Sequence, residues 1–237
     1  MARLGVNVTS VAAFREMGKY STADPVTAAV FAEVGGADGI VCSLKEELRP
    51  FTERDVRLLK EMVKTHLNVQ IPIVDKMIPL VFSVTPDMVT LIPGKKPGST
   101  EGGGLDVLGH ADELTRVVEE IRSREIVVSL RIEPIIHQVK AAAKVGADYV
   151  EFHMGKYTAA EDLNEKADLL ENISSVALAA SKIGLGVSAS GGLNYQNVMD
   201  ISAIEPIEEI NVGHAILCRA LWLGMEAAVR DMVALVH

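Results

Sequence analysis

Short apolar β-type segments alternate with helical segments along the whole chain, and this alternation constrains the fold most strongly. A single run of alternating strands and helices is typical of a parallel sheet with helical crossovers. No linker or shift in composition divides residues 1–237. We therefore expect an α/β chain folded as one (β/α)8 TIM barrel, a single domain with extra helices. A doubly wound open sheet is the alternative, although no GxGxxG motif follows the first strand.

Hydrophobic periodicity and helix-capping residues set the expected boundaries. Asp24 followed by Pro25 is a strong helix start, and Gly35-Gly36 is a matching end. We expect residues 9–22 to be a polar connection and residues 93–104, with two prolines and five glycines, to be irregular. The expected strands are 4–8, 38–43, 67–73, 88–92, 125–132, 149–152, 185–189 and 207–212, and the expected helices are 25–34, 57–64, 75–84, 112–122, 135–144, 159–182, 194–202 and 215–236.

Charge and cysteine content exclude several classes of protein. The chain has 23 basic and 32 acidic residues, a net charge of −9, which argues against nucleic acid or an anionic membrane as a partner. Its two cysteines form no CxxC motif, and no signal peptide or membrane-spanning segment is visible. We expect a cytoplasmic protein without a metal site or a cofactor.

Two glycine-rich turns follow the last two expected strands, where barrels often bind phosphate. Gly213 and His214 lie between a short strand and an apolar helix, and Ser190-Gly191-Gly192 ends the preceding strand. Backbone N–H groups at a helix start, approached closely through glycine, suit a phosphorylated ligand. An ordinary strand-to-helix turn is the alternative. Candidate cations for the ligand are Arg15, Lys19, Lys45 and Arg131.

Two further features are placed where chemistry is expected, at the carboxyl ends of strands. Glu151 and His153 are two residues apart on one strand, so they share a face and can form an acid–base pair. The alternative is that one of them braces a loop. The glycines of residues 93–104 permit a lid, and a disordered loop is the alternative there.

Short motifs are distributed over nearly the whole chain. They are Gly5-Val6-Asn7-Val8 with Val11-Ala12 and Arg15, Ala37-Asp38-Gly39-Ile40, Thr52-Glu53-Arg54-Asp55-Val56, Gly103-Gly104-Leu105-Asp106-Val107, Val128-Ser129-Leu130, Glu151 with His153 and Gly155, Gly192-Leu193, Tyr195 with Asn197-Val198, and residues 211–216. Together they resemble the pyridoxine 5′-phosphate synthase family. The resemblance implies an oligomeric (β/α)8 barrel that joins 1-deoxy-D-xylulose 5-phosphate to 3-amino-1-hydroxyacetone 1-phosphate as a pyridine ring closes.

The family's catalytic positions differ in this chain. The resemblance places catalytic His, Glu and His residues where this sequence has Ser43, Gln70 and Gly191. Thr9-Ser10 stands in place of the family's Asp-His, and Lys45 in place of an Arg. The family positions that this chain retains are mainly ones that hold the ligand. Glu151 and His153 are the candidate catalytic residues among them. The resemblance places phosphate or substrate contacts at Asn7, Arg15, Lys45, Thr100, Gly192, Gly213 and His214.

Three functions follow as alternatives. The chain is an enzyme of this family or one with related chemistry, a paralog that binds a phosphorylated metabolite without the family's reaction, or a structural partner subunit. The loss of three proton carriers favours altered or lost activity, because Ser and Gln do not titrate near neutral pH and Gly has no side chain. Apolar helices 26–34 and 215–236 predict a homo-oligomer.

Overall fold

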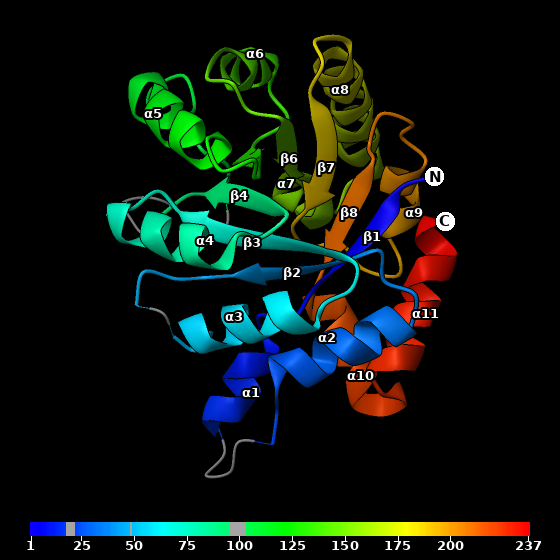
Figure 1. The fold of residues 1–237 in the computed structure, drawn as a ribbon. Coiled ribbons are helices and arrows are strands. Elements are labelled where there is room, and N and C mark those ends of the chain that lie inside the picture. Colours follow the sequence, from blue (N-terminus) through cyan, green and yellow to red (C-terminus); the bar gives the residue numbers. More distant parts are fainter. Residues whose placement is uncertain (18–21, 48, 95–102) are drawn as a thin grey trace.

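The structure is a computed structural model, and it describes residues 1–17, 22–47, 49–94 and 103–237. Within these ranges eight parallel strands form a closed barrel in sequence order, with β1 paired to both β2 and β8 (Figure 1). The expected (β/α)8 barrel is confirmed, and the open sheet is excluded. The strands are β1 (Arg3–Asn7), β2 (Gly39–Ser43), β3 (His66–Pro72), β4 (Met88–Ile92), β5 (Val127–Ile132), β6 (Tyr149–His153), β7 (Gly186–Ser190) and β8 (Glu209–Val212).

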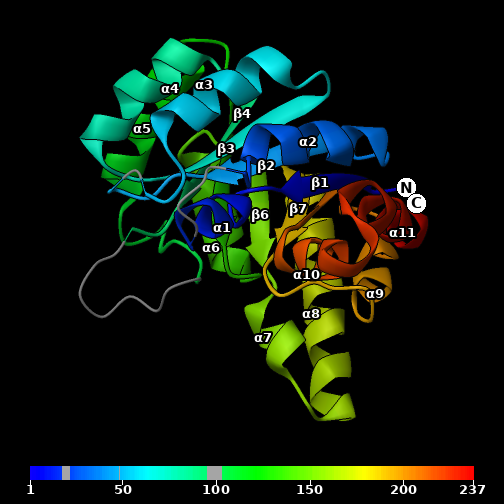
Figure 2. The same cartoon turned by 90° about the horizontal axis from the view of Figure 1, so that it is seen from below.

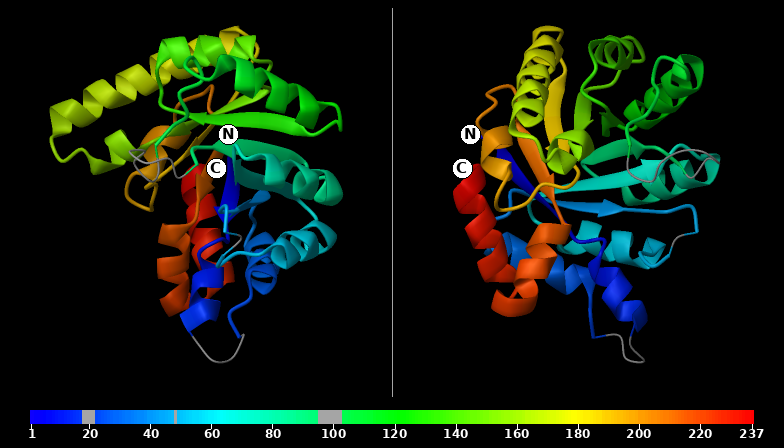
Figure 3. Two further views of the ribbon diagram at one scale, coloured as in Figure 1. Left: turned by 90° about the vertical axis from the view of Figure 1, so that its left-hand side faces the viewer. Right: turned by 180° about the vertical axis from the view of Figure 1, so that it is seen from behind.

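Helices surround the barrel, and the two chain ends lie close together on one side of it (Figures 1 and 2). Helix α7 and the start of α8 extend beyond the rest of the molecule (Figure 3). No helix in the described ranges is long and apolar enough to cross a membrane. The helices are α1 (Val11–Met17), α2 (Pro25–Val34), α3 (Glu53–Met62), the 3₁₀ turn η1 (Asp75–Met77), α4 (Ile78–Val84), α5 (Ala111–Arg122), α6 (Ile136–Lys144), α7 (Gly155–Ala159), α8 (Leu163–Lys182), α9 (Val198–Ser202), α10 (His214–Leu223) and α11 (Met225–Val236).

Capping residues fix the starts of two helices, α2 and α3. Asp24 caps α2 by accepting hydrogen bonds from two backbone N–H groups of its first turn, with Pro25 at the first helical position. Thr52 and Asp55 form a reciprocal capping box at the start of α3. Such caps satisfy N–H groups that the helix itself leaves without a partner. The start of α2 agrees with the sequence prediction, whereas α3 begins at Glu53, four residues before the expected residue 57.

Other expected boundaries were wrong as well: α9 begins at Val198 rather than at residue 194. Three further differences have a local reason. The polar connection 9–22 contains helix α1, because Val11 and Ala12 pack into the core. The expected helix 215–236 is broken at Gly224, whose φ of +80° leaves the helical region and separates α10 from α11. The expected helix 159–182 begins at Leu163, after the N-cap Asp162, and the short helix α7 precedes it.

The inside of the barrel is polar, while its outer face carries the apolar core. Residues alternate along each strand, so Leu4 and Val6 face the helices, while Gly5 and Asn7 face inward. A Cβ atom at Gly5 would lie 1.9 Å from Asn211 Oδ1, so only glycine leaves room for that amide. The buried polar residues on the strands are Asn68, Gln70, Thr90, Ser129, Glu151, Ser188, Ser190, Glu209 and Asn211.

Candidate active site

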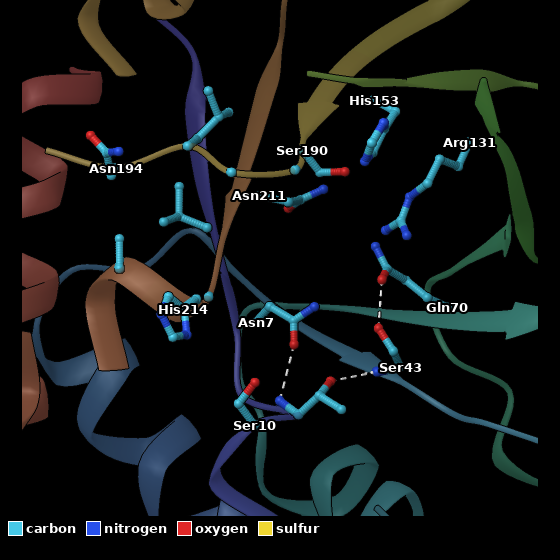
Figure 4. A pocket seen from close by; sticks show the side chains of 17 residues that line it. Asn7, Ser10, Ser43, Gln70, Arg131, His153, Ser190, Asn194, Asn211 and His214 are labelled. Carbon is cyan, nitrogen blue, oxygen red and sulfur yellow. Dashed lines mark hydrogen bonds between the residues drawn. The ribbon is translucent and has the colours of Figure 1, made fainter. Parts of the chain in front are cut away.

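A pocket of about 450 Å³ opens at the carboxyl ends of the strands (Figure 4). Its wall combines strand-end side chains with the loops that follow β1, β7 and β8. This is the end of a (β/α)8 barrel where active sites lie. The pocket is lined by Asn7, Thr9, Ser10, Ser43, Gln70, Arg131, His153, Ser190, Gly191, Gly192, Leu193, Asn194, Asn211, Val212, Gly213, His214 and Ala215.

The two glycine turns lie side by side on the pocket wall, as the sequence predicted. Strands β7 and β8 are neighbours, with Ser190 in register with Asn211. Gly191 and Gly192 have φ values of +98° and +73°, a left-handed conformation that other residues adopt only with strain. Gly213 is the N-cap of α10 and offers no side chain to its first turn. The N–H groups of that turn therefore remain available to an anion.

Glu151 lies fully buried beneath the pocket and is held by donors from three strands. Arg131 Nε donates to its carboxylate over 2.7 Å, and Asn211 Nδ2 donates over 2.8 Å. Gln70 Nε2 completes the set at 3.3 and 3.2 Å from the two oxygens. A carboxylate bound by three donors holds the side chains of Arg131, Asn211 and Gln70 in place at the base of the pocket. Among the described residues it forms no hydrogen bond with His153, and of the two expected partners in acid–base work His153 alone lines the pocket.

A chain of hydrogen bonds connects the ends of β1, β2 and β3. The Thr9 N–H donates to Asn7 Oδ1 over 3.0 Å, and Thr9 Oγ1 accepts from the Ser43 N–H over 2.7 Å. Ser43 Oγ donates to Gln70 Oε1 over 2.6 Å (Figure 4). All four side chains are neutral. Positions 43 and 70, where the family resemblance expects proton carriers, therefore belong to an uncharged hydrogen-bonded network.

His153 is oriented by a carboxylate that the sequence reading did not assign to it. Its Nδ1 lies 3.2 Å from Glu133 Oε1, and Lys156 Nζ lies 3.2 Å from the other Glu133 oxygen. The opposite edge of the ring faces the β7 turn: a Cβ at Gly191 would lie 2.8 Å from His153 Cδ2 and 3.0 Å from Nε2. His153 thus occupies the space beside position 191. Its pairing with Glu133 is the arrangement of a general acid or base held by an orienting carboxylate.

Two expected contact residues, Arg15 and Lys45, are not part of this pocket wall. Arg15 donates to both oxygens of Asp55 over 2.7 and 2.6 Å and to Pro50 O, so its guanidinium is engaged elsewhere. Burial acts to raise the pKa of the Asp55 carboxyl, but hydrogen bonds from Arg15 and Thr52 outweigh it and hold that pKa below its usual value. Lys45 is exposed after β2. Thr100 and Lys19 lie outside the described residues, as does most of the expected lid.

Two buried polar atoms in the pocket wall lack a partner among the described residues. They are Ser190 Oγ and Asn211 Oδ1, on residues that are each only 5% exposed. An unpaired buried polar atom costs free energy, and such atoms cluster where a ligand or water completes the bonding. Asn211 and Glu133 are site residues that sequence reasoning missed. Both lie at the end of a strand, and Asn211 also belongs to the motif 211–216, but neither signal assigned them a role.

The described ionisable residues of the wall are Arg131, His153 and His214. The wall therefore carries no carboxylate there, although the chain as a whole has a net charge of −9. Fold and site together define a (β/α)8-barrel protein with a polar pocket, lined by Arg131 and two histidines, at the carboxyl ends of its strands. Residues 4–237 match the family described as pyridoxal phosphate biosynthesis protein PdxJ, and the chain belongs to this family.

Curated relatives support the same family over the full length. The chain is 44% identical to a pyridoxine 5′-phosphate synthase of Geotalea daltonii, an alignment that covers 100% of this chain and 99% of the relative. A protein of the same name from Geobacter sulfurreducens is also 44% identical, with the same coverage. The resemblance read from the sequence motifs is thereby confirmed at the level of the family.

Solved structures at low identity share the fold alone. KGPDC from Streptococcus mutans superimposes with a TM-score of 0.66 at 12% identity and covers 100% of this chain and 97% of its own. Phosphoribosylanthranilate isomerase from Thermotoga maritima gives a TM-score of 0.62 at 13% identity, with coverage of 100% and 98%. Both comparisons support the barrel architecture.

Proposed function

We propose that this chain binds a phosphorylated small molecule at the rim of β7 and β8, and that it performs the family's ring closure very weakly or not at all. One observation carries the proposal. The pocket keeps both glycine turns and the N-terminus of α10, whereas positions 43, 70 and 191 of the same pocket are Ser, Gln and Gly. Binding needs the first set, and proton transfer needs titratable groups in the second.

The geometry of the neutral positions supports weak catalysis. Ser43 and Gln70 are engaged with each other, and Gln70 is also engaged with Glu151. A single positioned acid or base typically contributes about 10² to 10⁴-fold to a rate. When catalytic groups act together, the rate decreases caused by losing each of them do not multiply. We therefore expect the overall decrease in rate to be closer to that of one lost group than to the product of all three. Even that loss makes turnover hard to detect.

The direct test of catalysis uses both family substrates. The purified chain is incubated with 1-deoxy-D-xylulose 5-phosphate and 3-amino-1-hydroxyacetone 1-phosphate, and pyridoxine 5′-phosphate is followed by mass spectrometry. The synthase of Geotalea daltonii is the positive control. We expect a rate at least about 10²-fold lower for this chain. Turnover within about tenfold of the control would contradict the proposal.

Binding is tested separately, because it does not depend on turnover. Isothermal titration with pyridoxine 5′-phosphate and with 1-deoxy-D-xylulose 5-phosphate measures affinity. Gly213→Ala should weaken it, because a Cβ there would lie 3.0 Å from both Asn7 Cβ and Asn7 O, so the turn that carries the α10 N–H groups must shift to make room. Gly184→Ala, which has open space around its Cβ and lies outside the pocket wall, is the control. Absence of heat with either ligand at millimolar concentration would argue against the proposal.

One observation favours a second candidate, an enzyme that acts on another phosphorylated substrate. His153 pairs with Glu133, which orients the ring, and the other edge of the imidazole faces the β7 turn. Such a pair transfers protons in many enzymes. Loss of a pH-dependent activity in His153→Gln, with phosphate binding retained, would support this candidate. A turnover that survives in that variant would exclude His153 as the proton carrier.

We further propose a cytoplasmic homo-oligomer. Large apolar side chains are exposed on α2 and at the end of α10, including Trp222 at 85% and Val34 at 60%. Exposed apolar patches of this kind mark protein contacts more often than free surface. Light scattering at micromolar concentration should give a mass above that of one 25.4 kDa chain. A monomer would refute the assembly, and Trp222→Ser should shift the equilibrium toward monomer.

A further inference from the structure

We propose that the pocket has a second anion subsite, built around Arg131, and that the ligand is a phosphorylated carboxylic acid. The inference deepens the proposed function and rests on it, because the phosphate at the α10 N-terminus defines one end of the ligand. Arg131 and His214 lie on opposite sides of the pocket, with Asn211 between them (Figure 4). A ligand that spans the pocket therefore presents its far end to Arg131.

The guanidinium of Arg131 has hydrogen-bonding capacity left after it holds Glu151. Its side chain is 15% exposed, and Nε donates to Glu151 Oε1 over 2.7 Å. Among the described residues, the terminal nitrogens of Arg131 have no hydrogen-bond partner. A guanidinium carries five N–H donors in a planar fork, and the edge remote from Glu151 matches two coplanar carboxylate oxygens.

The surroundings of Arg131 also favour an anion. Glu151 balances the charge of Arg131, yet that carboxylate is 0% exposed and is covered by Gln70 and Asn211. From the pocket, a ligand meets donors rather than the carboxylate. His153 lies on the same side (Figure 4). A ligand carboxylate there gains charge-assisted hydrogen bonds, and it faces no carboxylate among the described residues that line the pocket.

Ser190 supplies an independent observation at this end of the pocket. Its Oγ is buried and has no partner among the described residues, although the residue lines the pocket. Figure 4 shows the hydroxyl directed toward the side where His153 and Arg131 lie. A hydroxyl in this position completes its bonding by donating to a carboxylate oxygen. An alcohol or methyl group at the end of a ligand would satisfy Arg131 less well, because neither offers two negative oxygens.

Matched ligand pairs test the subsite in the full-length protein by isothermal titration. Each pair keeps the phosphate ester and the carbon number and replaces the carboxylate by a hydroxymethyl group. The pairs are 2-phosphoglycolate with 2-hydroxyethyl phosphate, 3-phosphoglycerate with glycerol 3-phosphate, and 4-phosphooxybutanoate with 4-hydroxybutyl phosphate. In at least one pair we expect the acid to bind about tenfold more tightly or better. Three lengths remove dependence on the span of one ligand.

Variants separate recognition from folding. Arg131→Gln should abolish the preference for the acid while the alcohol keeps its affinity within about threefold, and Arg131→Lys should retain part of it because the charge remains without the fork. Arg131→Gln leaves Glu151 without its cation, so Arg131→Gln with Glu151→Gln is measured beside it. Arg122→Gln, which removes an ion pair with Asp148 outside the pocket wall, is the matched control.

The outcomes are distinguishable. Equal binding of acid and alcohol in all three pairs overturns the Arg131 subsite and leaves the phosphate site standing. A parallel loss of both affinities in Arg131→Gln and in the double variant, with Arg122→Gln unchanged, also overturns it, because the role of Arg131 is then structural. Absence of binding by all six compounds and by inorganic phosphate refutes the proposed function, and the subsite with it.

Discussion

The amide of Gln70 donates from Nε2 to both carboxylate oxygens of Glu151, over 3.3 and 3.2 Å. Ser43 Oγ donates to the opposite end of the same amide, Oε1, over 2.6 Å, and so fixes which end faces the carboxylate. A neutral donor at position 70 suits a fully buried Glu151. A second carboxylate at that position would face it directly, which makes restoration of the family's Glu at position 70 unfavourable by itself.

We expect Gln70→Glu to lower the free energy of unfolding by about 2 kcal/mol at pH 8, equivalent to a shift of one to two pKa units. Two carboxylates in contact cannot both ionise, so the folded state holds a proton that the unfolded chain releases. The pKa of the pair is therefore raised on folding, and the deficit shrinks as the pH falls. Urea denaturation at pH 5 and pH 8 measures it. Ser43→Ala should lose about 1 kcal/mol without pH dependence, and a pH-independent loss in Gln70→Glu would contradict the argument.

Gly191 and Gly184 form a matched pair for testing the contact with His153. Both have positive φ, +98° and +87°, but only Gly191 places its Cβ against another residue, 2.8 Å from His153 Cδ2. Gly184→Ala should cost about 1 kcal/mol from backbone strain alone. Gly191→Ala should cost at least about 1 kcal/mol more, and Gly191→His more again, because the imidazole of His153 must move. If the two alanine variants lose the same free energy of unfolding, the imidazole of His153 moves aside at no measurable cost, which contradicts the prediction.

Asp55→Asn should be among the most destabilising single changes near the barrel mouth, at about 3 kcal/mol, because it leaves the guanidinium of Arg15 without its anion. Glu53→Gln in the same helical turn removes an exposed i,i+4 pair with Arg57 and should cost at most about 0.5 kcal/mol. Since the pKa of Asp55 is lowered on folding, its contribution is present above the unfolded pKa and is lost as the pH falls through the folded one. Thermal melts at pH 7 compare the two variants, and similar losses would count against a structural role for the Arg15–Asp55 pair.

Glu209 at the opposite end of the barrel should make the protein less stable as the pH rises. Burial raises its pKa to about 7, Arg3 at 3.7 Å opposes the shift, and Glu151 adds to it. Between the unfolded pKa and about 7, the folded state binds more protons than the unfolded state, so the free energy of unfolding falls across this range. Glu209→Gln should remove this slope and exceed the wild type in stability at pH 8. Urea denaturation from pH 4.5 to 8 measures the free energy of unfolding of both proteins. If the two pH profiles run parallel, the predicted role of Glu209 is contradicted.

The sequence by itself determined the order of strands and helices and hence the closed barrel. Alternating apolar segments, the Asp24-Pro25 helix start and the two glycine turns are local signals, and each is set by residues a few positions apart. Because parallel strands in sequence order place their carboxyl ends on one rim, the neighbouring positions of Gly192 and Gly213 followed as well. Helix α1 and the break at Gly224 did not follow, since packing decides short helices and a single glycine is an ambiguous signal.

Only the tertiary structure decided which side chains meet. Gln70 and Glu151 are 81 residues apart, and Asn211 and Glu151 are 60 apart, so their contacts exist only once the barrel closes. The same closure pairs Arg15 with Asp55 and His153 with Glu133 rather than with Glu151. Local spacing reports the face of a strand on which a residue lies, but not the partner across the barrel. That partner is fixed by strand order, register and side-chain length together, and these become definite only in the folded molecule.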